Sequence, residues 1–340
     1  MLVTKPWVDG LKELLLCCNL NLHKIISTGS SVPLIALILW VCAFGNISAA
    51  ERSDTMRVTM LGTGTPVPNA ERLGSAILVE VAAKRLLFDC GRGAVIRLTQ
   101  AGVTPSEIDG LFLTHLHSDH VVGIPDLWLS GWFLGRDRPL QVWGPSGTRS
   151  MGEHLLQAFA FDIHIREDAP EPLPAKGAEI DAKEIEQGNV YDDGSVRVTA
   201  FVVDHGPVKP AFGYRVDYEG HSVVISGDTR FSQNLIKFAE HADCLIHVAW
   251  NPSSKNPTPP SLRSLASAED AGRVFATVRP KLGVIYHYKD EEGLWDAVHK
   301  EYNGPFVVAK DLMVIDVGST VTWRGRPSRS GKTARDKSRS

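Results

Sequence analysis

Three imidazoles and a carboxylate lie within six residues, at His115, His117, Asp119 and His120, directly after the apolar run Leu111–Thr114. Buried polar groups at this density are costly unless each is bonded. A metal cation satisfies them together, and nitrogen with carboxylate oxygen suits zinc, with manganese or iron as substitutes. Four such ligands fit poorly around one ion, so we expect the first two residues to face one cation and the last two a second.

Two cations need more ligands than this run provides. Three further residues follow apolar, strand-like stretches at their carboxyl ends, namely His205, Asp228 and His287. In layered α/β proteins ligands gather where neighbouring strands end, so four strand ends can supply one site. A lone histidine after a strand is more often structural or solvated, and the clustered run is what favours a metal role for the other three.

The elements that must position these residues alternate along the chain. β-Rich runs are interleaved with helical patterns, and this arrangement predicts a layered α/β fold in which helices cover the sheets. The expected strands are Arg57–Leu61, Ala76–Val81, Lys84–Asp89, Leu111–Thr114, Gln141–Trp143, Val196–Val203, Phe212–Tyr218, His221–Ser226, Cys244–Val248 and Leu282–Tyr286. The expected helices are Val121–Leu134, Thr148–Phe161, Ser232–Glu240, Ser267–Val278 and Glu292–Tyr302.

The two ends of the chain differ from this pattern. Three lysines precede the apolar stretch Val32–Phe44, and Ser48-Ala49-Ala50 then leads to Glu51. This order predicts a signal peptide over residues 1–50 and a periplasmic or secreted product. The apolar stretch is shorter than the ~20 residues of a membrane span, so no permanent span is expected. Residues 51–323 form the predicted hydrolase domain, and residues 324–340 a disordered basic tail.

The net charge gives no general attraction to nucleic acid. Lys and Arg number 36 against 39 Asp and Glu, for a formal charge of −3. Proteins that bind nucleic acids usually carry a basic face. The sequence therefore disfavours nucleic acid as a partner and favours a small-molecule ester, with a homodimer compatible with this assignment.

The ligand run, the later histidines and Gly-Asp-Thr at 227–229 resemble the metallo-β-lactamase superfamily, from Met56 to Val317. Leu-Gly-Thr-Gly-Thr-Pro at 61–66, Phe-Asp-Cys-Gly at 88–91 and the run from His205 to Arg215 are similar to the branch of ribonuclease Z and the zinc arylsulfatases. The resemblance implies a four-layer αβ/βα sandwich with its metals where the two sheets meet.

Carried over by position, the resemblance assigns a role to each ligand. His115, His117 and His205 would bind the first zinc, and Asp119, His120 and His287 the second, with Asp228 bridging them. Two cations that share a hydroxide lower the pKa of its parent water and polarise an ester bond. Asp119 could also hold or deprotonate that nucleophile.

Four more residues are candidates at the periphery of this site. Asp89 ends a strand and is expected to orient a ligand histidine, although a buried structural carboxylate fits nearly as well. Trp128 and Trp132, one helical turn apart, and Trp250 are interpreted as a substrate pocket. Core packing is the more common role of such tryptophans.

The substrate prediction rests on two differences between this chain and ribonuclease Z. Its tRNA-binding arm lies between the third histidine motif and Gly-Asp-Thr, but here only a hairpin around Glu219-Gly220 joins these positions. Its His-Glu-Ala-Thr motif is His247-Val248-Ala249-Trp250 in this chain, so the proton donor for the leaving group is missing. The sequence predicts an exported two-zinc hydrolase of small esters, similar to arylsulfatases or phosphodiesterases. The alternatives are a 3′-tRNA-processing endoribonuclease, and a lactonase or a non-catalytic metal-binding protein.

Overall fold

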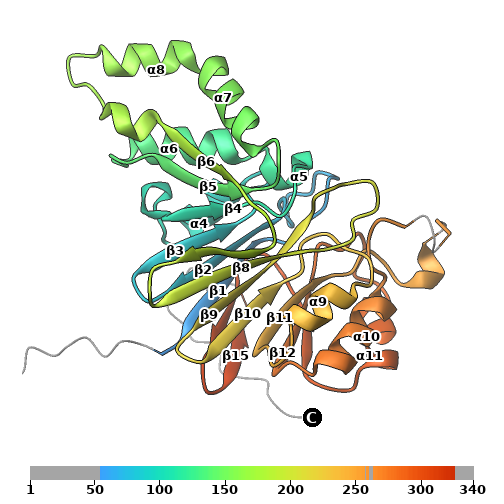
Figure 1. The fold of residues 1–340 in the computed structure, drawn as a ribbon. Helices are drawn as coiled ribbons and strands as arrows, with labels where there is room; N and C mark the ends of the chain where they lie inside the picture. The colour runs from blue at the N-terminus through green and yellow to red at the C-terminus, as the bar shows by residue number, and fades with distance from the viewer. Residues whose placement is uncertain (1–53, 257, 260–262, 326–340) are drawn as a thin grey trace, which may run out of the picture. The chain divides into compact units, whose positions relative to one another are not determined.

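The structure is a computed structural model that describes residues 54–256, 258–259 and 263–325. The signal peptide predicted over residues 1–50, and all but the first two residues of the predicted basic tail, lie outside the described residues. Two β-sheets dominate the rest, one of 8 strands and one of 7. Figure 1 shows them side by side, with helices on their outer faces.

The first sheet has the strand order β15-β14-β1-β2-β3-β4-β5-β6. Its antiparallel half contains the predicted hairpin, in which Ile77 pairs with Phe88 across the turn at Ala82-Ala83. From β3 to β6 the neighbouring strands run parallel, so they end at one edge. The strands are β1 Met56–Gly62, β2 Ala76–Val81, β3 Lys84–Phe88, β4 Gly110–Phe112, β5 Leu140–Gly144, β6 Ile180–Glu184, β14 Met313–Val317 and β15 Val321–Arg324. Arg324, assigned to the tail from the sequence, pairs with Val314.

The second sheet has the order β13-β12-β11-β10-β9-β8-β7. Strands β10 to β13 are parallel, whereas β7 to β10 form an antiparallel meander. The strands are β7 Gly188–Asp192, β8 Val196–Val202, β9 Phe212–Tyr218, β10 His221–Ile225, β11 Cys244–Val248, β12 Leu282–Tyr286 and β13 Phe306–Val308.

Helices cover the outer face of each sheet. Near the first sheet lie α4 Ala94–Gln100, η1 Pro105–Glu107, α5 Ser118–Val121, α6 Ile124–Phe133, α7 Thr148–Ala158, α8 Ala160–Glu167 and η2 Ala175–Ala178. Near the second lie α9 Gln233–Phe238, η3 Ser253–Lys255, α10 Ala268–Val278 and α11 Leu294–Glu301. Helices α7 and α8 extend beyond the sheets at the end where β5 and β6 lie (Figure 1). The predicted α/β class, a four-layer αβ/βα sandwich, is confirmed.

Three apolar clusters correspond to the spaces between these layers. The largest lies between the two sheets. Strands of both sheets contribute every second side chain to it, because alternate side chains of a strand point to opposite faces of a sheet. In it Phe112 stacks on Phe88, with ring centroids 5.1 Å apart, and on Trp143 at 4.8 Å. The Tyr214 hydroxyl donates to the Leu113 carbonyl at 2.7 Å and so ties the end of β4 to the second sheet. This contact brings strand ends of both sheets to one edge.

The helix predicted over Val121–Leu134 is interrupted. Gly123 separates α5 from α6 because its backbone packs directly against another loop, and a Cβ there would lie 2.4 Å from the Gly91 carbonyl oxygen. Pro125 then occupies the first turn of α6, where a missing N–H costs nothing. Within the described part of the chain no helix has the length and apolar character needed to cross a membrane.

Candidate metal centre

The predicted ligands meet at the edge where the two sheets join. His115 lies in the loop after β4, and Asp119 and His120 lie in the first turn of α5. From the second sheet His205 follows β8, Asp228 follows β10 and His287 follows β12. Their side chains are buried except that of His117, which is exposed. Two groups of converging ligand atoms result, one of four residues and one of three.

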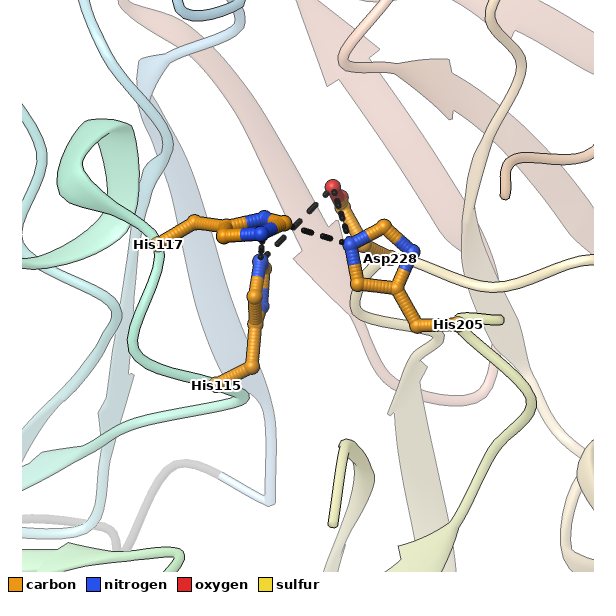
Figure 2. A group of neighbouring side chains, drawn as sticks. All are labelled: His115, His117, His205 and Asp228. Atoms are coloured by element: carbon orange, nitrogen blue, oxygen red, sulfur yellow. Dashed lines mark hydrogen bonds and ion pairs between the residues drawn. The ribbon is translucent and has the colours of Figure 1, made fainter. Parts of the chain in front are cut away.

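The first group consists of His115, His117, His205 and Asp228. Figure 2 shows these side chains pointing toward a common centre from two sides. His117 Nδ1 lies 2.9 Å from His115 Nε2 and 3.3 Å from His205 Nε2. Two nitrogens bound tetrahedrally to one zinc at ~2.0–2.1 Å would lie about 3.3 Å apart. The spacing of these nitrogens therefore fits one cation.

The second group consists of Asp119, His120 and His287. His287 Nε2 lies 3.1 Å from Asp119 Oδ2 and 3.2 Å from His120 Nε2. Asp228 reaches both groups, because its Oδ2 lies 3.7 Å from both His205 Nε2 and His120 Nε2. Its other oxygen lies 3.7 Å from His287 Nε2. The geometry is that of two adjacent cation positions joined by one carboxylate.

The electrostatics of the site suit a bound cation. Asp228 Oδ1 is buried and accepts no hydrogen bond from the described residues. Burial and the surrounding imidazoles hold the pKa of His115 well below its ordinary value, so its nitrogens are neutral and free to bind a metal. Although burial opposes it, hydrogen bonding to His287 lowers the pKa of Asp119 to about 2. The ionised carboxylate of Asp119 and the neutral imidazole of His115 are donors of the kind that zinc prefers.

Asp89 and Thr114 contact the Nδ1 atoms of two of the candidate ligands, His120 and His115. Asp89 Oδ2 lies 2.7 Å from His120 Nδ1, and its Oδ1 accepts the Thr114 N–H at 2.8 Å. The Thr114 hydroxyl lies 3.0 Å from His115 Nδ1. Burial alone would lower the pKa of His120, but Asp89 and the other carboxylates raise it to about 9. Each partner occupies the Nδ1 side of its imidazole and leaves Nε2 directed at the site. Thr114 was not singled out from the sequence, although a hydroxyl beside the first histidine of the run was a usable signal.

His205 is held by the opposite loop. Its Nδ1 lies 2.9 Å from the Ser264 carbonyl oxygen. Arg230 secures the same loop, because its guanidinium donates to the Arg263 carbonyl and its backbone N–H donates to the Asp204 carbonyl at 2.7 Å. The residues directly after Asp228 thus fix the loop that orients another ligand.

The backbone at Asp119 packs directly against the backbone at Gly74 and Gly91. A Cβ on Gly91 would lie 2.2 Å from the Asp119 carbonyl oxygen, and one on Gly74 would lie 2.9 Å from the same atom. The Cys90 N–H donates to the His120 carbonyl at 2.7 Å, which fastens this contact. Glycine is required where backbones approach this closely. The Phe-Asp-Cys-Gly run therefore supports the ligand turn directly.

Two of the pocket tryptophans predicted from the sequence are misplaced. Trp128 and Trp132 are both 0% exposed, and their indole N–H groups donate to the Ala178 and Pro174 carbonyls. They belong to the packing beneath α6 because one helical turn places both on its inner face. Trp250 is partly exposed, and its ring centroid lies 6.3 Å from that of His287. It lines a cavity of about 230 Å³ together with Arg263 and Ser264.

His247, the other histidine that ends a strand, lies away from the ligands. It is 0% exposed and packs edge-on against Phe275 of α10, with ring centroids 6.2 Å apart. Burial lowers its pKa to about 4. The imidazole is therefore neutral and belongs to the helix side of the second sheet.

Comparison with known proteins agrees with this geometry. Residues 56–300 match the family described as anti-Pycsar protein Apyc1. Ribonuclease Z of Mycobacterium bovis (strain BCG / Pasteur 1173P2) is 32% identical over 280 residues, which are 77% of this chain and 98% of that protein. Ribonuclease Z of Mycolicibacterium gilvum (strain PYR-GCK) is 38% identical over 200 residues, 57% of this chain and 68% of that one.

Two solved structures share the fold. The metallo-β-lactamase fold protein YhfI of Bacillus subtilis superposes with a TM-score of 0.62 at 21% identity, over 77% of this chain and 99% of its own. Human tRNase Z, short form, superposes with a TM-score of 0.60 at 23% identity, over 76% of this chain and 98% of its own.

Proposed function

The chain belongs to the family described as anti-Pycsar protein Apyc1 and to the ribonuclease Z branch of the metallo-β-lactamase superfamily, and from this premise we propose that it cleaves RNA as a 3′-tRNA-processing endoribonuclease. It is a metal-dependent hydrolase that acts on phosphodiester bonds. Zinc is the proposed metal, since both ligand groups consist of imidazole nitrogen and carboxylate oxygen.

This conclusion corrects the substrate predicted from the sequence. The predicted arylsulfatase-like hydrolysis of small esters, with nucleic acid disfavoured as a partner, is wrong in view of the relatives. Proteins 32–38% identical to this chain are named ribonuclease Z. Net charge misled the prediction because it sums the whole chain, whereas a substrate meets only the surface around the site.

The single observation that carries the proposal is the extent of the likeness to Mycobacterium bovis ribonuclease Z. It covers 98% of that protein, so the relation is not confined to a shared metal motif. The family match over residues 56–300 also includes all the ligands, from His115 to His287. Both observations support phosphodiester chemistry at this site.

The residues of the chain divide the work of hydrolysis. Bound cations supply positive charge that lowers the pKa of an attacking water and stabilises charge developing on the phosphate. Asp119 holds that water and accepts its proton at a carboxylate oxygen, which its pKa of about 2 keeps ionised near neutral pH. Asp89 and Thr114 keep the Nε2 atoms of His120 and His115 directed at the site.

The leaving oxygen is handled differently from what the family resemblance implies. The motif expected to help supply its proton reads His247-Val248-Ala249-Trp250 here, and His247, the one titratable side chain in it, is fully buried on the helix side of the second sheet. We therefore expect solvent to supply the proton. The slow step should then depend on how good the leaving group is.

Substrate docking also differs from the expectation for an arm-bearing enzyme. Strands β9 and β10 are joined by the two-residue turn Glu219-Gly220, so within the described residues the segment between His205 and Asp228 holds no arm. We expect a higher KM for precursor tRNA than an arm-bearing ribonuclease Z would have. All the candidate metal ligands are present, so we expect cleavage without the arm.

A cleavage assay tests this proposal. Zinc-loaded protein is mixed with an end-labelled precursor tRNA that carries a 3′ trailer, and the cut is mapped on a gel. Asp119→Ala should lower the rate by about 10²–10⁴-fold, the usual contribution of a general base. Asp126→Ala is the matched control, since Asp126 is exposed on α6 and bonds only Ser130 among the described residues. No cleavage by the wild type, or equal cleavage by Asp119→Ala, would overturn the proposal.

A further inference from the structure

A second cavity borders the metal centre at His205. It has a volume of about 700 Å³ and is lined partly by His205, so a molecule inside it lies next to a metal ligand. Its walls are largely apolar, with Val202, Val203, Pro210 and Ala211 among them. Val202 is 43% exposed although it ends a strand. Cavities of about 300–1,000 Å³ with apolar walls and a few polar groups are typical ligand sites.

Among the described residues that line the cavity, Lys209 is the one lysine or arginine. Lys209 is exposed, lines the cavity, and forms no ion pair or side-chain hydrogen bond with the described residues. Its position is set by the metal ligand itself, because the Val208 N–H donates to the His205 carbonyl at 3.3 Å. Asp204 also lines the cavity, but its charge is paired, since its Oδ2 lies 3.5 Å from the Arg230 guanidinium and its Oδ1 accepts from the Gly206 N–H at 2.9 Å. The lysine ammonium is thus available to an anionic group.

Two polar residues also line the cavity, Asn234 and Ser232. The Asn234 amide nitrogen donates to the Val202 carbonyl at 2.7 Å and to Gln187 Oε1 at 2.8 Å, and its side-chain oxygen has no donor among the described residues. Ser232 Oγ accepts from the Leu235 N–H at 3.2 Å, which leaves its own proton to donate. One free acceptor and one free donor beside apolar walls suit the edge and faces of a nucleobase.

We propose that this cavity binds the nucleotide next to the scissile phosphate, with Lys209 contacting a phosphate oxygen and the walls from Val202 to Ala211 enclosing the base. The inference rests on the proposed function, because it takes the substrate to be a polynucleotide. It adds a specificity-determining residue and a nucleotide subsite adjacent to His205. Lys209 binds substrate and takes no part in the bond cleavage.

Binding measurements test the subsite without relying on catalysis. The probe is adenosine 5′-monophosphate, titrated into zinc-loaded protein by calorimetry, with inorganic phosphate as the comparison ligand. Lys209→Ala should raise the Kd for adenosine 5′-monophosphate roughly tenfold, the effect of losing a charged hydrogen bond at an exposed site. Lys237→Ala is the matched control, because Lys237 is also exposed and unpaired among the described residues but does not line the cavity.

A second variant separates the base from the phosphate. Val202→Trp fills the apolar end of the cavity and should weaken adenosine 5′-monophosphate binding while leaving inorganic phosphate binding unchanged. Unchanged nucleotide binding in either Lys209→Ala or Val202→Trp, or no nucleotide binding by the wild type, would overturn the subsite. Equal losses for the two ligands in Val202→Trp would do the same.

The precursor-tRNA assay on the same preparations distinguishes the two proposals. Nucleotide binding that depends on Lys209, without tRNA cleavage, supports the subsite and rejects tRNA processing. Cleavage that proceeds with an unaltered KM in Lys209→Ala rejects the subsite and leaves the proposed function standing. A several-fold higher KM for the precursor with an unaltered kcat supports both.

Discussion

Replacing Asp89 by asparagine changes one atom of a buried carboxylate and should reverse the tautomer of a metal ligand. The carboxylate lies 2.7 Å from His120 Nδ1, so it holds the proton there and leaves Nε2 free. Its other oxygen accepts the Thr114 N–H, which keeps the oxygen of an asparagine on that side. The amide NH₂ would then face Nδ1 as a donor. That contact moves the imidazole proton to Nε2, the atom that should bind metal.

The expected loss of zinc affinity is confined to the second cation position, which His120 would help to form. Loss of such an orienting partner typically weakens metal affinity 10–100-fold, about 1.4–2.7 kcal/mol. The assay is a competition titration with a chromophoric zinc chelator, which resolves the affinities of the two equivalents. Asp89→Asn should weaken one equivalent by this factor and leave the other near its wild-type value.

The control for this prediction is Asp243→Asn. Asp243 is also buried, at 6% exposed, and accepts a backbone N–H from Ser222 at 2.8 Å, but it precedes β11 at the opposite end of the parallel strands. It should lower the free energy of unfolding without changing zinc affinity. Wild-type affinity for both equivalents in Asp89→Asn would refute the tautomer argument, as would an equal loss in Asp243→Asn.

Three other predictions follow from the same structure. Gly91→Ala should destabilise the fold by about 1–3 kcal/mol through overpacking and lower the zinc occupancy, since its Cβ would lie 2.2 Å from the Asp119 carbonyl oxygen. Gly152→Ala is the control, because its Cβ would meet nothing closer than 3.4 Å. Denaturation and metal titrations should show a loss of stability and of zinc for Gly91→Ala and no loss of either for Gly152→Ala. The pKa of His247 is lowered to about 4 in the folded state, so the unfolded chain protonates first and the free energy of unfolding should fall from about pH 6.5 to about pH 4, by up to about 1.4 kcal/mol per unit; a denaturation series that keeps this slope in His247→Leu would contradict the assignment. Export stays a prediction: mass spectrometry of protein recovered from cells should find an N-terminus near Glu51 if residues 1–50 are removed, and an intact first segment would reject it.

The ligand positions could be predicted because they depend on local rules. His205, Asp228 and His287 each follow an apolar run, and the structure brings these strand ends to one edge. The same reasoning placed Asp89 behind a ligand histidine, where the structure has it. Residue type and strand end were sufficient in these cases.

Other features depend on tertiary packing that no local pattern encodes. The spacing of Trp128 and Trp132 identifies a shared helix face but not what that face meets, and it meets the core. The edge strands β6 and β7 went unpredicted because their sequences, Ile-Asp-Ala-Lys-Glu and Gly-Asn-Val-Tyr-Asp, hold few apolar residues, and none of these residues is fully buried. The cavity beside His205 arises only when the start of α9 packs against the end of β8, where Asn234 donates to the Val202 carbonyl.

The central claim is that two cations share one site. Elemental analysis of zinc-reconstituted protein after gel filtration measures it directly, with His117→Ala and His287→Ala as variants, because each belongs to one ligand group only. We expect two equivalents of zinc in the wild type and about one in each variant. One equivalent or none in the wild type, or two retained in both variants, would contradict it.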